Sequence, residues 1–143
     1  MTRVDFYILD NSQSRAKTLF ACRLTEKIYK SGYTLLLYTS SEKQSSDLDN
    51  LLWTFRQGSF VPHAIYTASS SSSAPVLITN TMKDSNTPAQ VLVNLCDDVP
   101  NFFSRFERVA EIVDGNNRIQ SRKRYRFYQE RGYPLHTHNL ANT

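Results

Sequence analysis

The sequence of 143 residues predicts a single α/β domain with a mostly parallel mixed sheet and helices on both faces. Strand-like and helix-like segments alternate in the first half of the chain, and this alternation is typical of parallel sheets. The first two strand-like segments are almost continuously apolar, as expected for strands that are buried on both faces. A chain of this length fits one domain that buries about two thirds of its unfolded surface.

The chain begins with a predicted strand at residues 4–9. The polar residues 11–14 follow it and supply an N-cap for a helix. The helix is predicted because apolar residues recur at intervals of three or four, with charged residues between them. Gly32 then marks its C-cap. The apolar positions are Ala16, Leu19, Phe20, Leu24 and Ile28.

A second strand and helix are predicted next. Residues 33–38 are too apolar for a solvent-exposed face, which again predicts a strand that is buried on both sides. Ser40 or Ser41 then caps a helix that continues to Trp53.

The rest of the chain completes the sheet and adds a C-terminal helix. Pro62 keeps its predecessor out of the helical region, which predicts a turn or extended loop, and a run of five serines predicts a surface loop. In order, we expect loops at 58–63 and 69–73, strands at 76–79, 90–95 and 108–113, a short helix at 99–106 that places Phe102, Phe103 and Phe106 near the sheet, a turn at 114–117, and a final helix that ends at Gly132 and Pro134.

The final helix contains the densest group of basic residues. Arg118, Arg122 and Arg126 recur every four residues and therefore lie along one side of the helix as a basic stripe, with Tyr125 beside them. Guanidinium groups bind carboxylate or phosphate oxygens two bonds at a time, and a neighbouring ring offers an apolar face. The basic stripe predicts an anionic ligand, which is nucleic acid, a nucleotide or an acidic protein segment. The alternative is a solvated basic face. Lys123, Arg124, Phe127 and Tyr128 complete the group.

The chain as a whole is only mildly basic, with 17 Lys and Arg against 13 Asp and Glu and a net charge of +4. A protein that binds DNA directly usually carries a broader basic surface than one helix. The mean hydropathy is -0.47, and no apolar run approaches the length of a membrane span. The N-terminus lacks the apolar core and cleavage site of a signal peptide, which predicts a cytoplasmic protein.

No catalytic or cofactor site is predicted, so we do not expect an enzyme. The phosphate-binding loops of nucleotide-binding proteins need closely spaced glycines, and no two glycines of this chain are close enough to form one. No serine or cysteine lies in a recognisable nucleophile motif. The four glycines are Gly32, Gly58, Gly115 and Gly132.

The cysteines and histidines favour structural interpretations. Cys22 and Cys96 match neither a disulfide framework nor metal-binding spacing, which predicts buried free thiols. A metal site of His63, His136 and His138 is conceivable. The favoured interpretation is that the last two belong to a solvated tail, because they follow Pro134 near the end of the chain.

Four segments resemble the chi subunit family of bacterial DNA polymerase III. They are the opening Val4–Asp10, the helix end Leu48–Trp53, the Ser59–His63 loop, and the ending that runs from Arg124–Tyr128 to Gly132–Leu135. The resemblance runs in order over nearly the whole chain, and the loop that follows Trp53 is its most specific part.

The resemblance implies a Rossmann-like fold without a phosphate-binding loop, in a chi-like domain of residues 1–135 followed by a C-terminal tail of residues 136–143. It also implies a non-catalytic subunit of the clamp-loader assembly, without a cofactor, that functions in DNA replication. Members of this family pair with the psi subunit, which connects them to the clamp loader. They also bind the acidic C-terminal tail of single-stranded-DNA-binding protein, which ends in Phe, so contact with DNA is only indirect.

The resemblance also assigns two binding surfaces. The site for the acidic tail consists of Val113, Arg118, Arg122, Tyr125 and Arg126, and it coincides with the basic stripe. The psi-binding surface consists of Trp53, Phe60, Val61 and Pro62. Burial in the core is an open alternative for Trp53, whereas Phe60 lies in a loop and is the better candidate for contact. The alternative function is direct binding of nucleic acid by the 118–126 helix, with Tyr125 or Tyr128 stacked on bases.

Overall fold

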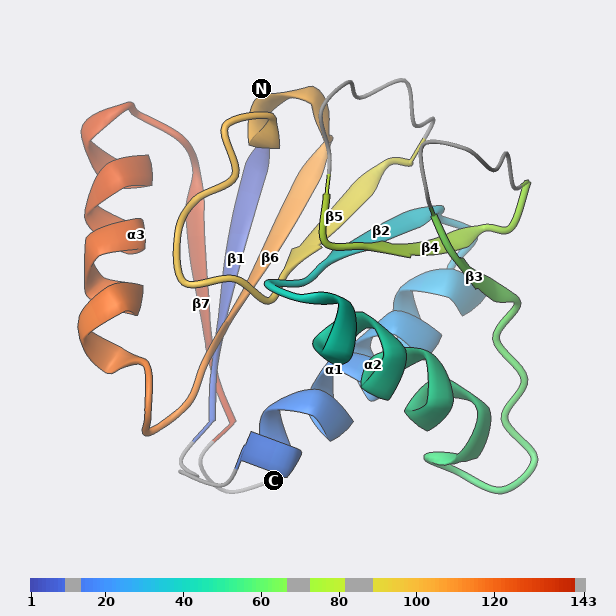
Figure 1. Ribbon diagram of the computed structural model, residues 1–143. Helices are drawn as coiled ribbons and strands as arrows, with labels where there is room; N and C mark the ends of the chain where they lie inside the picture. Colours follow the sequence, from blue (N-terminus) through green and yellow to red (C-terminus); the bar gives the residue numbers. More distant parts are fainter. Residues whose placement is uncertain (10–13, 67–72, 82–88, 141–143) are drawn as a thin grey trace.

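The computed structural model describes residues 1–9, 14–66, 73–81 and 89–140. Within them the chain forms one seven-stranded sheet with the strand order β3-β4-β2-β5-β6-β1-β7 (Figure 1). All of the pairings between the described strands are parallel, so the predicted α/β class is confirmed and the sheet is parallel rather than mixed. The strands are β1 (Arg3–Ile8), β2 (Leu35–Tyr38), β3 (His63–Ile65), β4 (Val76–Thr79), β5 (Val91–Asn94), β6 (Arg108–Val113) and β7 (Leu135–Asn139).

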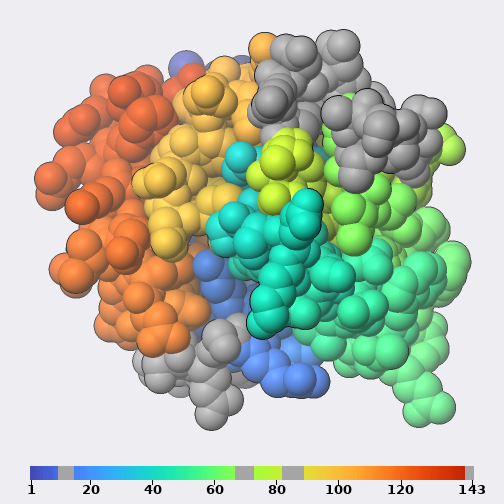
Figure 2. Space-filling model, viewed as in Figure 1, coloured from blue at the N-terminus to red at the C-terminus, as the bar shows by residue number. Residues whose placement is uncertain are grey.

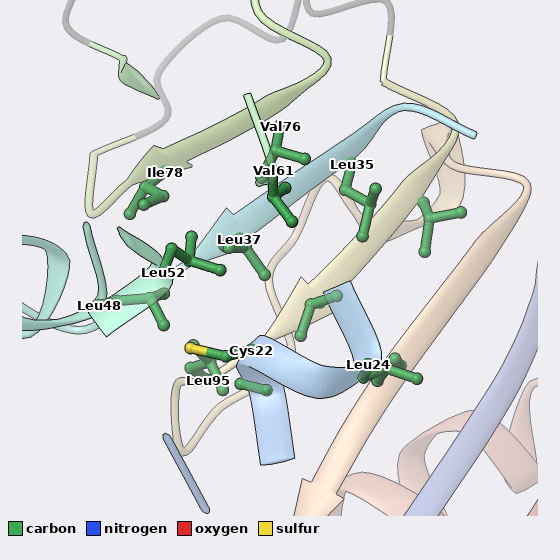
Figure 3. Packing of buried hydrophobic residues seen from close by; sticks show 14 of the residues in the cluster. Cys22, Leu24, Leu35, Leu37, Leu48, Leu52, Val61, Val76, Ile78 and Leu95 are labelled. Carbon is green, nitrogen blue, oxygen red and sulfur yellow. The ribbon is translucent and has the colours of Figure 1, made fainter. Parts of the chain in front are cut away.

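Helices cover both faces of the sheet, as predicted. Helices α1 (Ser14–Lys30) and α2 (Glu42–Thr54) pack on one face, where Figure 3 shows their side chains meeting those of the strands. The other face is covered by α3 (Arg118–Glu130) and by the short 3₁₀ helix η1 (Phe103–Arg105). The core is therefore two apolar layers on either side of the central strands. None of the helices in the described part of the chain is long and apolar enough to cross a membrane.

The predicted helix ends agree with the structure where they can be compared. Ser41 is the N-cap of α2, and its side chain accepts a hydrogen bond of 3.1 Å from the backbone N–H of Gln44. Gly32 follows α1 with a φ of 93°, a left-handed conformation that favours glycine at this position. Both caps confine the helices to the length that the apolar periodicity indicates. The predicted serine loop at 69–73 lies outside the described residues except for Ser73.

The predicted helix at 99–106 is wrong in extent, because only the 3₁₀ turn of η1 forms there. Pro100 keeps the preceding Val99 out of the helical region. The backbone N–H groups of Phe103, Arg105 and Phe106 bond to carbonyl oxygens three residues back, which is the pattern of a 3₁₀ helix. Phe102, Phe103 and Phe106 nevertheless pack against the sheet as expected.

The predicted C-terminal tail is also corrected, since residues 135–139 form β7 and pair with β1 at the edge of the sheet. The ring of His138 stacks on Tyr7 with the centroids 4.6 Å apart, and its Nε2 lies 2.9 Å from Oδ1 of Asp5. His138 is thus part of the sheet and not of a solvated tail. His63 lies on β3, at the opposite edge from His136 and His138, so the three histidines do not converge on a metal ion.

Asp5 joins three adjacent strands through one buried carboxylate. Its oxygens lie 3.1 Å from Nη2 of Arg3, 3.2 Å from Nη2 of Arg108 and 2.9 Å from Nε2 of His138. Burial by itself would raise the pKa of Asp5, but the hydrogen bonds from His138, Arg108 and Arg3 outweigh it and lower the pKa below its ordinary value. The ionised form of Asp5 therefore stabilises the folded state.

The Asp5→Asn variant should lose about 1.5–3 kcal/mol of unfolding free energy at neutral pH, because charge-assisted bonds to three strands are weakened. Because the pKa of Asp5 is lower in the folded state, its stabilisation is present above the ordinary value of 3.8 and is lost as the pH falls through the folded pKa. Urea unfolding across this range should show the two proteins converging in acid. A constant difference at every pH would contradict the role of the ionised carboxylate.

Candidate functional site

A cavity of about 400 Å³ lies between α3 and the sheet. Its lining includes four of the five residues that the family resemblance assigns to acidic-tail binding, namely Val113, Arg118, Arg122 and Tyr125. Its other lining residues are Phe6 and Ile8 of β1, Ser121 of α3, and Thr137 and Asn139 of β7. Residues from three strands and one helix, distant in the sequence, thus meet in one recess.

The cavity has an apolar floor and a basic border. Phe6 and Val113 are buried, and the edge of the half-buried Tyr125 ring packs against Phe6 with the centroids 5.2 Å apart. Arg118 and Arg122 lie on the exposed side of α3 beside this floor. Such an arrangement can hold an apolar ring and a negatively charged group at the same time.

Arg126 is exposed but does not line the cavity, in contrast to the rest of the predicted set. The reason is helix geometry, since each residue advances by about 100° around an α-helix. Arg124 faces inward. Around the helix axis, Arg122 lies about 160° from Arg124 in the direction of the cavity, and Arg126 lies about 160° from Arg124 in the opposite direction. Arg126 therefore lies next to the mouth of the cavity, where it can add positive charge.

Arg124, one of the basic residues clustered in the final helix, is buried. Its Nε donates a hydrogen bond of 2.9 Å to Oε1 of Glu111. Its Nη1 donates to the carbonyl oxygen of Asp97 at 2.7 Å, and its Nη2 donates to Oγ of Ser121 at 3.0 Å. The guanidinium is thus engaged within the protein and ties α3 to β6 and to the segment after β5.

Glu111 is fully buried and accepts hydrogen bonds from three residues, two on α3 and one on β5. Besides Arg124, the Tyr128 hydroxyl donates at 2.7 Å and Nδ2 of Asn94 lies 3.0 and 3.1 Å from its two oxygens. Burial raises the pKa of Glu111, and the Arg124 guanidinium and the other donors oppose that shift. Burial and the adjacent carboxylate also raise the pKa of Tyr128, which keeps its hydroxyl protonated as a donor.

The turn between β6 and α3 extends this network to the cavity. Oδ1 of Asp114 accepts hydrogen bonds from the backbone N–H groups of Asn116 and Asn117 at 2.9 and 3.1 Å. Oδ1 of Asn117 in turn accepts from the backbone N–H of Asp114 at 2.9 Å and from Oγ of Ser121 at 3.1 Å. The start of α3 and its rotation about its own axis are therefore determined by buried polar contacts.

The Arg124→Met variant should lose about 3–5 kcal/mol of unfolding free energy, because it leaves Glu111 buried without its cationic partner. Arg126→Met is the matched control, since the same change at an exposed position should alter stability by about 0.5 kcal/mol or less. Urea unfolding of both variants measures the difference. Equal losses would mean that Arg124 does not anchor α3.

A second candidate surface lies at the other end of the sheet, where Trp53 and Phe60 are 50% and 66% exposed. Their ring centroids are 5.9 Å apart, and Trp53 also packs 4.3 Å from the ring of the buried His63. Burial of Trp53 in the core is therefore wrong. Val61 is fully buried in the core, which removes it from the predicted contact set, whereas Pro62 is partly exposed.

The buried His63 packs against the Trp53 ring and makes polar contacts that hold this surface in place. Its Nδ1 lies 2.6 Å from the carbonyl oxygen of Val61, and its Nε2 lies 3.3 Å from Oδ1 of Asp49. These contacts hold the start of β3 against α2 and leave Trp53 and Phe60 at the surface. Figures 1 and 2 show that this green segment after α2 and the orange-red α3 lie on opposite sides of the molecule.

In the described part of the chain, the cysteines and the metal-binding residue types do not come together in a reactive site. Burial raises the pKa of Cys22 to about 12 and that of Cys96 to about 11, so both thiols stay protonated at neutral pH. Cys22 is buried as predicted, whereas Cys96 is only partly buried. Among the described residues, no group of three His, Cys, Asp or Glu side chains could hold a metal ion.

Comparison with known proteins gives concordant matches over nearly the full length of the chain. Residues 1–136 match the family model of the DNA polymerase III chi subunit, HolC. The chain is 39% identical over 142 residues to the DNA polymerase III subunit chi of Pseudomonas aeruginosa, with 98% of each chain covered. It is 29% identical over 143 residues to the subunit chi of Escherichia coli, which covers 96% of this chain and 97% of that protein.

Proposed function

The chain belongs to the DNA polymerase III chi subunit family, and we propose that it links the psi subunit to the acidic C-terminal tail of single-stranded-DNA-binding protein. In this role it is a non-catalytic accessory subunit of the clamp-loader assembly in the bacterial cytoplasm. The observation that carries the proposal is the cavity under α3, where an apolar floor lies next to the guanidinium groups of Arg118 and Arg122.

The cavity suits an acidic peptide that ends in Phe. The ring of the terminal residue can fill the recess above Phe6, Val113 and Tyr125, while its free carboxylate binds the guanidinium groups at the border. Upstream aspartates would then pass Arg126 at the mouth of the cavity. Each part of the ligand thus has a chemical counterpart in the protein.

Direct binding of nucleic acid is less well supported by the same helix. Tyr128 is fully buried and hydrogen-bonded to Glu111, so it cannot stack on a base. Tyr125 is half-buried and packs edge-on against Phe6. Since Arg124 is also internal, the helix offers a narrower basic and aromatic surface than its sequence indicates.

We assign psi binding to the exposed aromatic surface of Trp53, Phe60 and Pro62. Large aromatic residues that remain exposed next to each other are typical centres of protein–protein contact. The surface lies near β3, whereas the cavity lies beside β7, and these strands are the two edges of the sheet. Both partners can therefore bind the same molecule at once, as a linking subunit requires.

A free acidic peptide that ends in Phe should bind the cavity with a dissociation constant in the micromolar range, which corresponds to a binding free energy of about -8 kcal/mol. Removal of the terminal Phe should abolish most of this affinity, because the apolar recess is left empty. Arg122→Ala should weaken binding about tenfold to a hundredfold through the loss of a charge-assisted contact. Fluorescence anisotropy with labelled peptide measures each effect.

Arg23→Ala is the matched control for this measurement, because Arg23 is exposed on α1, on the other face of the sheet. It should bind the peptide like the unmodified protein. Tight binding of poly-dT with a steep salt dependence, and no response to the terminal Phe, would instead support the nucleic-acid alternative and refute the proposed role of the cavity.

Phe60→Ala should weaken binding of purified psi subunit by about 2 kcal/mol or more, as expected for an exposed aromatic residue at the centre of an interface. Its stability and its affinity for the acidic peptide should not change. Ile119→Ala is the matched control, since Ile119 is 67% exposed against 66% for Phe60 but lies on α3. Calorimetric titration that finds equal psi affinity for both variants would rule out this surface.

A further inference from the structure

The outer edge of the sheet lies directly beside the cavity. β7 is an edge strand that pairs with β1 on one side. Two of its residues, Thr137 and Asn139, line the cavity together with Arg118 and Arg122 of α3. A ligand in the cavity is therefore also next to the backbone of β7.

The backbone groups of β7 alternate in direction. The N–H of Val4 donates to the carbonyl oxygen of Pro134 at 3.0 Å, and the N–H of Leu140 donates to that of Ile8 at 2.9 Å. In a parallel ladder these bonds direct the even-numbered residues of β7 toward β1. The N–H and C=O groups of Leu135 and Thr137 consequently point away from the sheet, on the side where a further strand would pair.

This edge lacks the devices that commonly keep sheet edges from pairing. Exposed edges are usually short or carry lysine, proline or a bulge. The opposite edge strand β3 has only three residues. β7 has five residues, Leu-His-Thr-His-Asn, with neither lysine nor proline among them. It is the more accessible of the two edges for an extended segment.

We infer that an acidic peptide held in the cavity adds to the sheet as a further strand alongside β7. The inference rests on the proposed function and specifies how the ligand's main chain binds. The terminal ring lies in the cavity, the acidic side chains lie near the basic stripe of α3, and the peptide backbone exchanges hydrogen bonds with the outward groups of β7. Main-chain hydrogen bonds would fix which residue of the peptide lies opposite which residue of β7, even though the peptide has few distinctive side chains.

Thr137→Pro tests this pairing from the protein side. Proline removes the outward N–H of residue 137, and it is tolerated in an edge strand when that N–H does not bond to the neighbouring strand. Peptide affinity should fall by about threefold to tenfold, which is the effect of one lost hydrogen bond. Thr137→Val changes the same side chain but keeps the N–H, so it should bind the peptide about threefold to tenfold more tightly than Thr137→Pro. Circular dichroism checks that both variants fold.

N-methylation of single peptide residues tests the pairing with the unmodified protein and decides the case if Thr137→Pro fails to fold. Affinity should fall by about threefold to tenfold at alternate residues and stay constant at those between them. Equal affinity for every N-methylated peptide would overturn strand addition. If removal of the terminal Phe still weakened binding in that case, the proposed function would stand but strand addition would not. If that removal also had no effect, the proposed function itself would fail.

Discussion

The buried ion pair between Glu111 and Arg124 is the interaction on which the candidate binding surface depends. Both side chains are almost inaccessible to solvent, and the pair is 2.9 Å long. Breaking such a pair is costly because one charge stays buried without its partner, so α3 has a single favourable rotation about its axis. With Arg124 turned inward, Arg118, Arg122 and Tyr125 are directed toward the cavity.

The rest of the fold places the two proposed binding surfaces near opposite edges of the sheet. The parallel sheet holds the cavity under α3 near one edge and the exposed Trp53 and Phe60 near the other. Asp5 ties β7 to β1 and β6, which keeps the cavity wall formed by Thr137 in place. The parallel sheet thereby provides a rigid support for the two protein ligands that we propose.

Much of the fold could be predicted from the sequence, because the first strands are apolar and the first helices are periodic and capped. β7 was missed because its polar sequence has no apolar alternation, and its stability comes from β1 and Asp5, which are distant in the sequence. The sequence does not distinguish the buried Arg124 from the exposed basic residues around it. One signal for a buried cationic partner was present in the sequence, because Glu111 places a carboxylate within an apolar strand. The helix spacing did place Arg118, Arg122 and Tyr125 correctly beside each other.

The most direct test of the central claim is an NMR measurement of intermolecular contacts between isotope-labelled protein and an unlabelled acidic peptide that ends in Phe. We expect nuclear Overhauser effects from the ring of the terminal Phe to the Val113 methyl groups and to the Tyr125 ring, both of which line the cavity. Contacts of that ring with Trp53 or Phe60, and none with Val113 or Tyr125, would contradict the account.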